Sequence, residues 1–145
     1  MTTFELNQQH FSLSELMQVI NTGAEVTLGE KAKAAIQKCR TFLDEKVSHS
    51  EEHIYGINTG FGSLYDQSIS NDELAKLQVN LVRSHACGTG AIVPNKIVKT
   101  MLLFKAIGLH YGHSGAQVET VERLIYFYNN DIIPVVYEQG SLGAS

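Results

Sequence analysis

The sequence has few of the residue types that build disulfide-bonded, metal-bound or membrane-spanning proteins. Its two cysteines, Cys39 and Cys87, lie far apart and fit no metal-ligand spacing. No stretch approaches the roughly 20 apolar residues that a membrane-spanning helix needs. The N-terminus, MTTFELNQQHF, has no basic start followed by an apolar run, so we expect no signal peptide. These absences favour a cytoplasmic protein whose thiols are free.

Basic residues are also scarce. The 11 lysines and arginines are outnumbered by 15 acidic residues and form few clusters, which argues against nucleic acid or an anionic membrane surface as a partner. With 43% hydrophobic residues the chain is too apolar for disorder. There is no internal repeat, no low-complexity tract and no proline- or serine-rich linker. We therefore expect residues 1–145 to form one folding unit.

Helix patterns fill the first third of the chain. Ser12 and Glu15 form an S-x-x-E capping box, in which each side chain satisfies a backbone N–H at the helix start. An apolar stripe at three- and four-residue spacing follows, and Gly23 suits the left-handed position that ends many helices. Thr27 and Glu30 repeat the capping pattern, which predicts a second helix that runs to about residue 47.

Three more helices are expected further along the chain. Ser70 and Glu73 form a third capping box, and Pro94 suits the first turn of a helix that contains the mostly apolar run IVKTMLLFKAIGLHYG. A last apolar stripe runs from Val118 to Tyr128. The segment DIIPVVYEQG is predicted to be extended because of its proline and β-branched residues. The sequence thus predicts an all-α fold that leaves room only for short strands.

Two glycine-rich segments interrupt this pattern, namely residues 55–63 (YGINTGFGS) and residues 85–91 (HACGTGA). Glycine lets a backbone approach another surface closely but costs conformational entropy, so this density of glycines needs a reason. Neither segment has the spacing of a phosphate-binding loop, and neither follows a clear strand and opens a helix. Nucleotide binding is therefore disfavoured.

The histidines offer a second set of candidates. Residues 49–53, HSEEH, match the metal-binding pattern H-x-x-E-H, but no third ligand is evident and a solvated turn is the better interpretation. His110 and His113 end an apolar helix and are interpreted as capping or core histidines. His85 lies four residues after Leu81, so we predict that it continues a buried stripe and points inward. By itself, this position favours a hydrogen-bonded core histidine.

The last six residues, GSLGAS, end with Gly143, Ala144 and Ser145, which are all small. If a glycine follows them, a tight bend would bring its amide nitrogen against the carbonyl carbon of Ala144. Attack at that carbon with loss of water closes a five-membered ring. Loss of the Ser145 hydroxyl as a second water leaves an exocyclic methylene conjugated to carbonyls. The tail thus has the composition needed to form an electrophile from its own backbone.

Three motifs in this order, IYGINTGFGSL, NLVRSHACGTG and PVVYEQGSLGAS, closely resemble the histidine ammonia-lyase family. The resemblance covers the chain from about residue 10 to its end. It implies the N-terminal, mainly helical part of the ammonia-lyase (L-aspartase-like) fold, with glycine-rich active-site loops. It also implies that Ala144, Ser145 and a following glycine form the prosthetic group 4-methylideneimidazole-5-one (MIO), and that the longer protein is a homotetramer with shared active sites.

The resemblance further implies a role for each candidate residue. Tyr55 would be the base that removes a β-proton from the substrate L-histidine, and His85 would contact the imidazole ring of that substrate. Ammonia would then leave, and urocanate would remain. A chain that ended at Ser145 could not close the ring, so the expected activity is that of a longer parent protein.

Two alternatives stay open. The first is a tyrosine or phenylalanine ammonia-lyase or aminomutase, against which the Ser84-His85 pair favours histidine as the substrate. The second, of another class, is a non-catalytic helical interaction domain.

Overall fold

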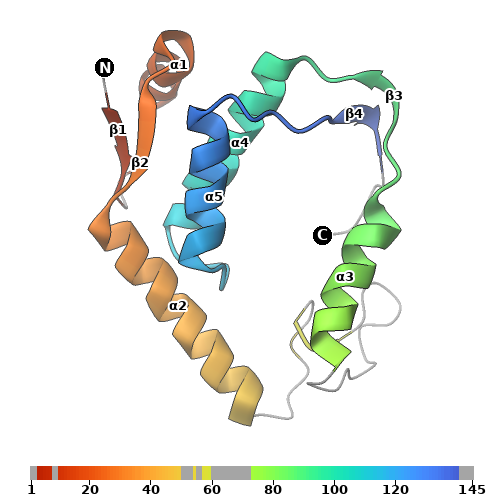
Figure 1. Cartoon of the computed structure of the whole chain (residues 1–145). Helices are drawn as coiled ribbons and strands as arrows, with labels where there is room; N and C mark the ends of the chain where they lie inside the picture. The colour runs from red at the N-terminus through yellow and green to blue at the C-terminus, as the bar shows by residue number, and fades with distance from the viewer. Residues whose placement is uncertain (1–2, 8–9, 50–53, 55–56, 60–72, 141–145) are drawn as a thin grey trace. The chain divides into compact units, whose positions relative to one another are not determined.

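The computed structural model describes residues 3–7, 10–49, 54, 57–59 and 73–140. Within these ranges the chain is mainly helical with a few short strands, which confirms the predicted fold class. None of the described helices is both long and apolar enough to cross a lipid bilayer. The elements, in chain order, are β1 (Thr3–Leu6), α1 (Leu13–Thr22), β2 (Glu25–Leu28), α2 (Glu30–His49), α3 (Leu74–His85), β3 (Thr89–Ile92), α4 (Asn95–His110), α5 (Val118–Asn129) and β4 (Tyr137–Gln139) (Figure 1).

Contacts divide the chain into two compact units. The first comprises Met1–Glu45 and Pro94–Pro134, and the second comprises Lys46–Val93 and Val135–Ser145. Each unit has its own pair of short strands, β1 with β2 in the first and β3 with β4 in the second. The folding of residues 1–145 as one cooperative unit stays a prediction.

Both ends of α1 are set by the residues that the sequence pattern singles out. The N–H of Glu15 donates to Ser12 Oγ at 3.3 Å, and the N–H of Ser12 donates to Glu15 Oε2 at 2.8 Å. Hydrogen bonds from the hydroxyl and the N–H of Ser12 hold the pKa of Glu15 below its usual value. Gly23 adopts the left-handed conformation at φ 62° and ψ 37°, and its N–H donates to Val19 O at 3.0 Å. The predicted capping box and glycine stop are confirmed.

The start of α2 differs from the prediction. Thr27 lies in β2, where it pairs in parallel with Glu5 of β1. The helix begins at Glu30, and Asn7 Oδ1 accepts a hydrogen bond from the N–H of Lys31 at 3.0 Å. The capping box predicted at Thr27 was wrong because strand pairing with a segment distant in sequence took that residue into a sheet.

The core of the first unit lies between α4 and α5, which run side by side, with β2 packed against α5 (Figure 1). Leu103 of α4 and Val121 of α5 are fully buried in it. The apolar run of α4 is therefore central, as its composition predicts. On the other side of α4, three large apolar side chains are exposed, namely Ile97, Met101 and Phe104.

The side chain of Asn129, the last residue of α5, binds the backbone of β2. Its Oδ1 accepts a hydrogen bond from the N–H of Val26 at 2.9 Å, and its Nδ2 donates to the carbonyl of Val26 at 2.8 Å. The amide thus satisfies both backbone groups of Val26, which is itself buried. This pair of hydrogen bonds fixes the end of α5 to the strand.

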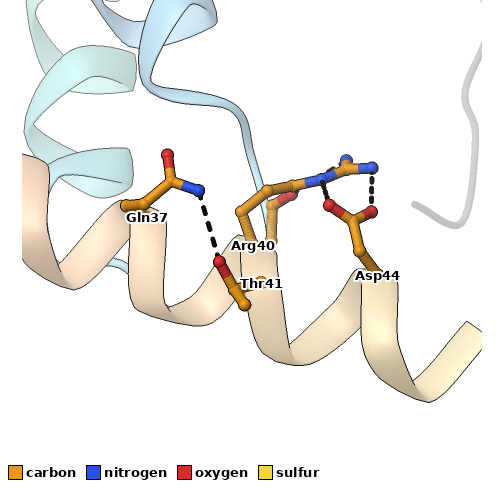
Figure 2. Close-up of polar contacts among 5 residues, drawn as sticks. Gln37, Arg40, Thr41 and Asp44 are labelled. Carbon is orange, nitrogen blue, oxygen red and sulfur yellow. Dashed lines mark hydrogen bonds and ion pairs between the residues drawn. The ribbon is translucent and has the colours of Figure 1, made fainter.

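Arg40 ties α2 to the loop between α4 and α5. Figure 2 shows its guanidinium bound to the Asp44 carboxylate one turn along the helix, with Nε donating to Oδ2 at 2.9 Å. This hydrogen bonding lowers the pKa of Asp44. Arg40 Nη1 also donates to the carbonyl of Gly115 at 3.4 Å. On the same helix, Gln37 Nε2 donates to Thr41 Oγ1 at 3.3 Å (Figure 2).

The same loop approaches the α2 backbone so closely at Gly112 that only glycine fits there. Gly112 has φ 70°, and a Cβ built on it would lie 2.5 Å from the carbonyl carbon of Ala35 and 2.8 Å from the nitrogen of Ile36. These neighbours are backbone atoms and cannot rotate away. Any side chain at this position would therefore separate the loop from α2.

We expect Gly112→Ala to lower the free energy of unfolding by about 3 kcal/mol, from a left-handed backbone penalty of roughly 1–2 kcal/mol and an overlap of roughly 1–3 kcal/mol. Gly23→Ala is the matched control, because Gly23 has φ 62° but nothing within 4 Å of its added Cβ. The free energy of unfolding of that variant should fall only by the left-handed backbone penalty. Gly108 lies in α4 with open space around an added Cβ, so Gly108→Ala should raise the free energy of unfolding by about 0.5–1 kcal/mol. Urea unfolding followed by circular dichroism measures all three, and equal losses for Gly112→Ala and Gly23→Ala would contradict the close approach.

The second unit contains α3 and the β3–β4 pair. The predicted α3 helix is confirmed from Leu74 onward, although Ser70 of its capping box lies outside the described residues. Glu73 at the N-cap position makes no side-chain capping hydrogen bond. The predicted extended segment after α5 is confirmed by β4, which pairs antiparallel with β3.

Candidate active site

Four residues are predicted to form the site, and the structure describes one of them. Tyr55, Ala144 and Ser145 lie outside the described residues, so their predicted roles stay predictions. His85 is described, as the last residue of α3.

The His85 ring is held by two polar atoms of the same helical turn. Its Nδ1 lies 2.9 Å from Ser84 Oγ and 2.9 Å from the carbonyl oxygen of Leu81. Ser84 Oγ in turn donates to the Leu81 carbonyl at 2.8 Å. Both contacts of the ring are made by Nδ1, and the Ser84 hydroxyl is itself held by the Leu81 carbonyl. These contacts orient the ring and do not involve Nε2.

The prediction that His85 points into a buried stripe was wrong for the described chain. His85 is exposed, and Leu77 and Leu81 are only half-buried. The spacing does place all three on one side of α3, but burial needs a neighbouring element. Among the side chains described between Lys76 and His85, none is buried. The ring is therefore accessible.

The residues on either side of Tyr55 in sequence are linked to each other. The N–H of Ile54 donates to Asn58 Oδ1 at 2.7 Å, and the N–H groups of Ile57 and Asn58 donate to the carbonyl of Ile54 at 3.0 and 3.2 Å. Asn58 is buried and Thr59 is fully buried. Sequence reasoning did not single out either residue. The available signal was Asn58, since asparagine side chains commonly close turns by bonding to nearby backbone.

Two of the three sequence motifs meet in the β3–β4 pair (Figure 1). β3 follows shortly after His85, and β4 shortly precedes the Ala144-Ser145 tail. A Cβ on Gly88 would lie 2.7 Å from Cδ2 of Tyr137, so glycine at this position permits the close approach. Among the glycines of residues 85–91, Gly88 thus has a structural reason: the absence of a side chain lets this segment pack against Tyr137 of β4.

Of the other histidine candidates, the structure describes His49, His110 and His113. Within the described ranges, no group of three or more His, Cys, Asp and Glu residues could hold a metal ion. His49 ends α2, while His53 lies outside the described residues. His110 is fully buried with Nδ1 against the Ile107 carbonyl, which confirms its interpretation as a core histidine, whereas His113 is exposed.

The sequence is similar to known ammonia-lyases over nearly its whole length. The family profile described as aromatic amino acid lyase matches residues 11–145. The histidine ammonia-lyase of Staphylococcus saprophyticus is 40% identical over 143 residues, which cover 99% of this chain and 28% of that protein. The histidine ammonia-lyase of Deinococcus radiodurans is 42% identical over 134 residues, covering 92% and 25%. The chain thus spans 28% or less of the length of these two curated relatives.

Solved structures have the same fold over 97% of this chain. The ergothionase of Treponema denticola matches with a TM-score of 0.88 at 25% identity, and the match covers 28% of that chain. The tyrosine aminomutase of Streptomyces globisporus has a TM-score of 0.87 at 27% identity, and the histidine ammonia-lyase of Trypanosoma cruzi has 0.78 at 29%, with 27% of each covered. Since a family profile and the fold agree from residue 11 onward, the chain belongs to the aromatic amino acid lyase family.

Proposed function

We propose that the chain is the N-terminal part of a longer cytoplasmic histidine ammonia-lyase, which converts L-histidine to urocanate and ammonia. The observation that best supports this is the β3–β4 pair, which joins the strand after His85 to the strand before the Ala144-Ser145 tail. The names and identities of the curated relatives support histidine as the substrate. We further propose that the longer protein is a homotetramer whose subunits share active sites.

The tail residues fit the prosthetic group MIO in composition. β4 ends at Gln139, and the exposed Gly140 that follows it has no atom within 4 Å of an added Cβ. Ala144 and Ser145 are small, and Ser145 has the hydroxyl that must leave. MIO would supply an electrophilic methylene that turns the α-amino group of the substrate into a better leaving group.

Tyr55 is the proposed base. A phenolate oxygen at this position would accept the β-proton of the substrate. The ordinary pKa of tyrosine is about 10, so nearby positive charge or hydrogen-bond donors must favour the phenolate. The hydrogen bonds between Ile54 and Asn58 join the described residues that flank Tyr55 in sequence. The glycines at 56, 60 and 62 would let the loop close over the substrate and exclude water.

His85 is the proposed contact to the substrate ring. Its exposed position at the end of α3 leaves the imidazole accessible to a ligand. Ser84 Oγ and the Leu81 carbonyl contact Nδ1, so Nε2 is the atom available to meet the substrate.

A second candidate is an aromatic aminomutase or a lyase acting on tyrosine or phenylalanine. It is favoured by the TM-scores of the aminomutase structures, which exceed that of the Trypanosoma cruzi histidine ammonia-lyase. These structures are 27–29% identical to the chain, whereas the curated histidine enzymes are about 40% identical. We therefore retain histidine as the substrate.

The longer protein is expected to release urocanate from L-histidine and to act far more slowly on L-tyrosine and L-phenylalanine. The increase in urocanate or cinnamate-type absorbance with each amino acid in turn measures this preference. Turnover of tyrosine without turnover of histidine would contradict the proposed substrate and favour the second candidate function. No turnover, together with an unmodified intact mass, would favour the non-catalytic interaction domain.

A further inference from the structure

Three polar atoms meet in the last turn of α3. Ser84 Oγ lies 2.8 Å from the Leu81 carbonyl oxygen, His85 Nδ1 lies 2.9 Å from that oxygen, and Nδ1 lies 2.9 Å from Ser84 Oγ. Each distance is that of a hydrogen bond. Each pair therefore needs a hydrogen atom between its members.

Counting the hydrogens decides which nitrogen of the neutral His85 ring is protonated. The Leu81 carbonyl oxygen only accepts, and the Ser84 hydroxyl has a single hydrogen. If Nδ1 had no hydrogen, one hydrogen would have to serve three close pairs. The Nδ1 lone pair would then face either the Leu81 carbonyl oxygen or the Ser84 oxygen with nothing between them.

Placing the hydrogen on Nδ1 satisfies every pair. The Ser84 hydroxyl donates to the Leu81 carbonyl, and Nδ1–H is shared between that carbonyl and Ser84 Oγ. The neutral ring then has an unprotonated Nε2, which is a hydrogen-bond acceptor.

We infer that Ser84 is a positioning residue that holds His85 in this tautomer, so that the site selects substrates presenting a hydrogen-bond donor on their ring. This inference rests on the proposed function, in which His85 meets the substrate side chain. An imidazole supplies such a donor through its ring N–H. Phenylalanine has none, and its ring would leave Nε2 without a partner in the closed site, which is costly.

The kinetic test compares L-histidine with 4-thiazolylalanine, a ring of similar size whose nitrogen only accepts. The ratio of kcat/KM for the two substrates is measured in the longer protein with Ser84, Ser84→Ala and Ser84→Thr. Ser84→Ala should narrow the ratio about three- to tenfold, the range for loss of one hydrogen bond. The change should fall mainly on KM for histidine, and Ser84→Thr, which keeps the hydroxyl, should restore the ratio.

A purely structural role for Ser84 predicts something different. Activity toward both substrates would then fall together, and the ratio would not move. That outcome, or a wild-type preference for 4-thiazolylalanine, would overturn the inference.

A spectroscopic test separates this inference from the proposed function. In ligand-free protein with ¹⁵N-labelled histidine, the ring signals of His85 are identified by their loss in His85→Gln. A protonated Nδ1 with an unprotonated Nε2 supports the assignment, and the reverse pattern overturns it even if histidine is deaminated. Conversely, the expected signals without any turnover of histidine would reject the proposed function and leave the tautomer assignment standing.

Discussion

Ser145→Ala in the longer protein is expected to abolish deamination, with a fall in kcat on the order of 10⁴-fold or more, as when the residue that provides covalent catalysis is removed from an enzyme. Alanine has no hydroxyl to leave, so the exocyclic methylene cannot form. Without it the α-amino group of the substrate stays a poor leaving group. Product absorbance with saturating L-histidine measures the loss.

Intact mass tests the cause of that loss. The wild-type protein should be lighter than its encoded sequence by two water molecules. Ser145→Ala should be lighter by one water molecule at most, because the second water comes from the Ser145 hydroxyl. Ser141→Ala removes a hydroxyl from the same tail but from outside the tripeptide, and should keep both the mass deficit and the activity. Full activity in Ser145→Ala would contradict the proposed prosthetic group.

Tyr55→Phe is expected to lower kcat by about 10³-fold, within the range that a positioned acid or base contributes. Phenylalanine has the same ring but no oxygen to accept the β-proton. The rate of the parent should rise with pH as the phenol loses its proton, and this rise should be absent from the variant. The measurement is the pH dependence of urocanate release.

The mass deficit of two waters should persist in Tyr55→Phe, since this residue has no part in closing the ring. Tyr126→Phe, on an exposed position of α5, is the matched control and should keep its rate. If Tyr55→Phe retained most of its activity, another group would have to be the base.

Local patterns predicted the helices well wherever the deciding contacts are local. The capping box of Ser12 and Glu15 lies within one helical turn, and Gly23 needs only its own backbone conformation. Likewise, the stripe of α5 places Val121, Ile125 and Tyr128 in the core because its period matches the helix. Each of these features is complete within a few residues.

The errors arise where a distant segment decides. Thr27 has Glu30 three residues later, as a capping box requires, yet pairing with Glu5 makes it part of a strand. The cap of the next helix comes instead from Asn7, which binds the N–H of Lys31 from 24 residues away in sequence. Nothing in residues 27–30 reveals these partners. Similarly, helical spacing correctly aligned His85 with Leu81, but spacing cannot supply the element that would bury them.

The candidate site was predicted through its motifs. The resemblance that these motifs carry makes Tyr55, His85 and Ser145 candidates, whereas general patterns alone leave them ambiguous. The hydrogen bonding of Ser84 and the buried Asn58 were missed because both depend on side-chain geometry over one turn. The adjacency of β3 and β4 was also missed, since the intervening helices separate them in sequence.

The Asn129 amide has a consequence for aggregation. A two-stranded parallel sheet presents unpaired backbone along its outer sides, where strands of other molecules can add. Because the amide already occupies both the N–H and the C=O of Val26, an incoming strand cannot continue its ladder through the middle of β2. One asparagine thus protects that side of the sheet without adding a charge, a proline or a further strand.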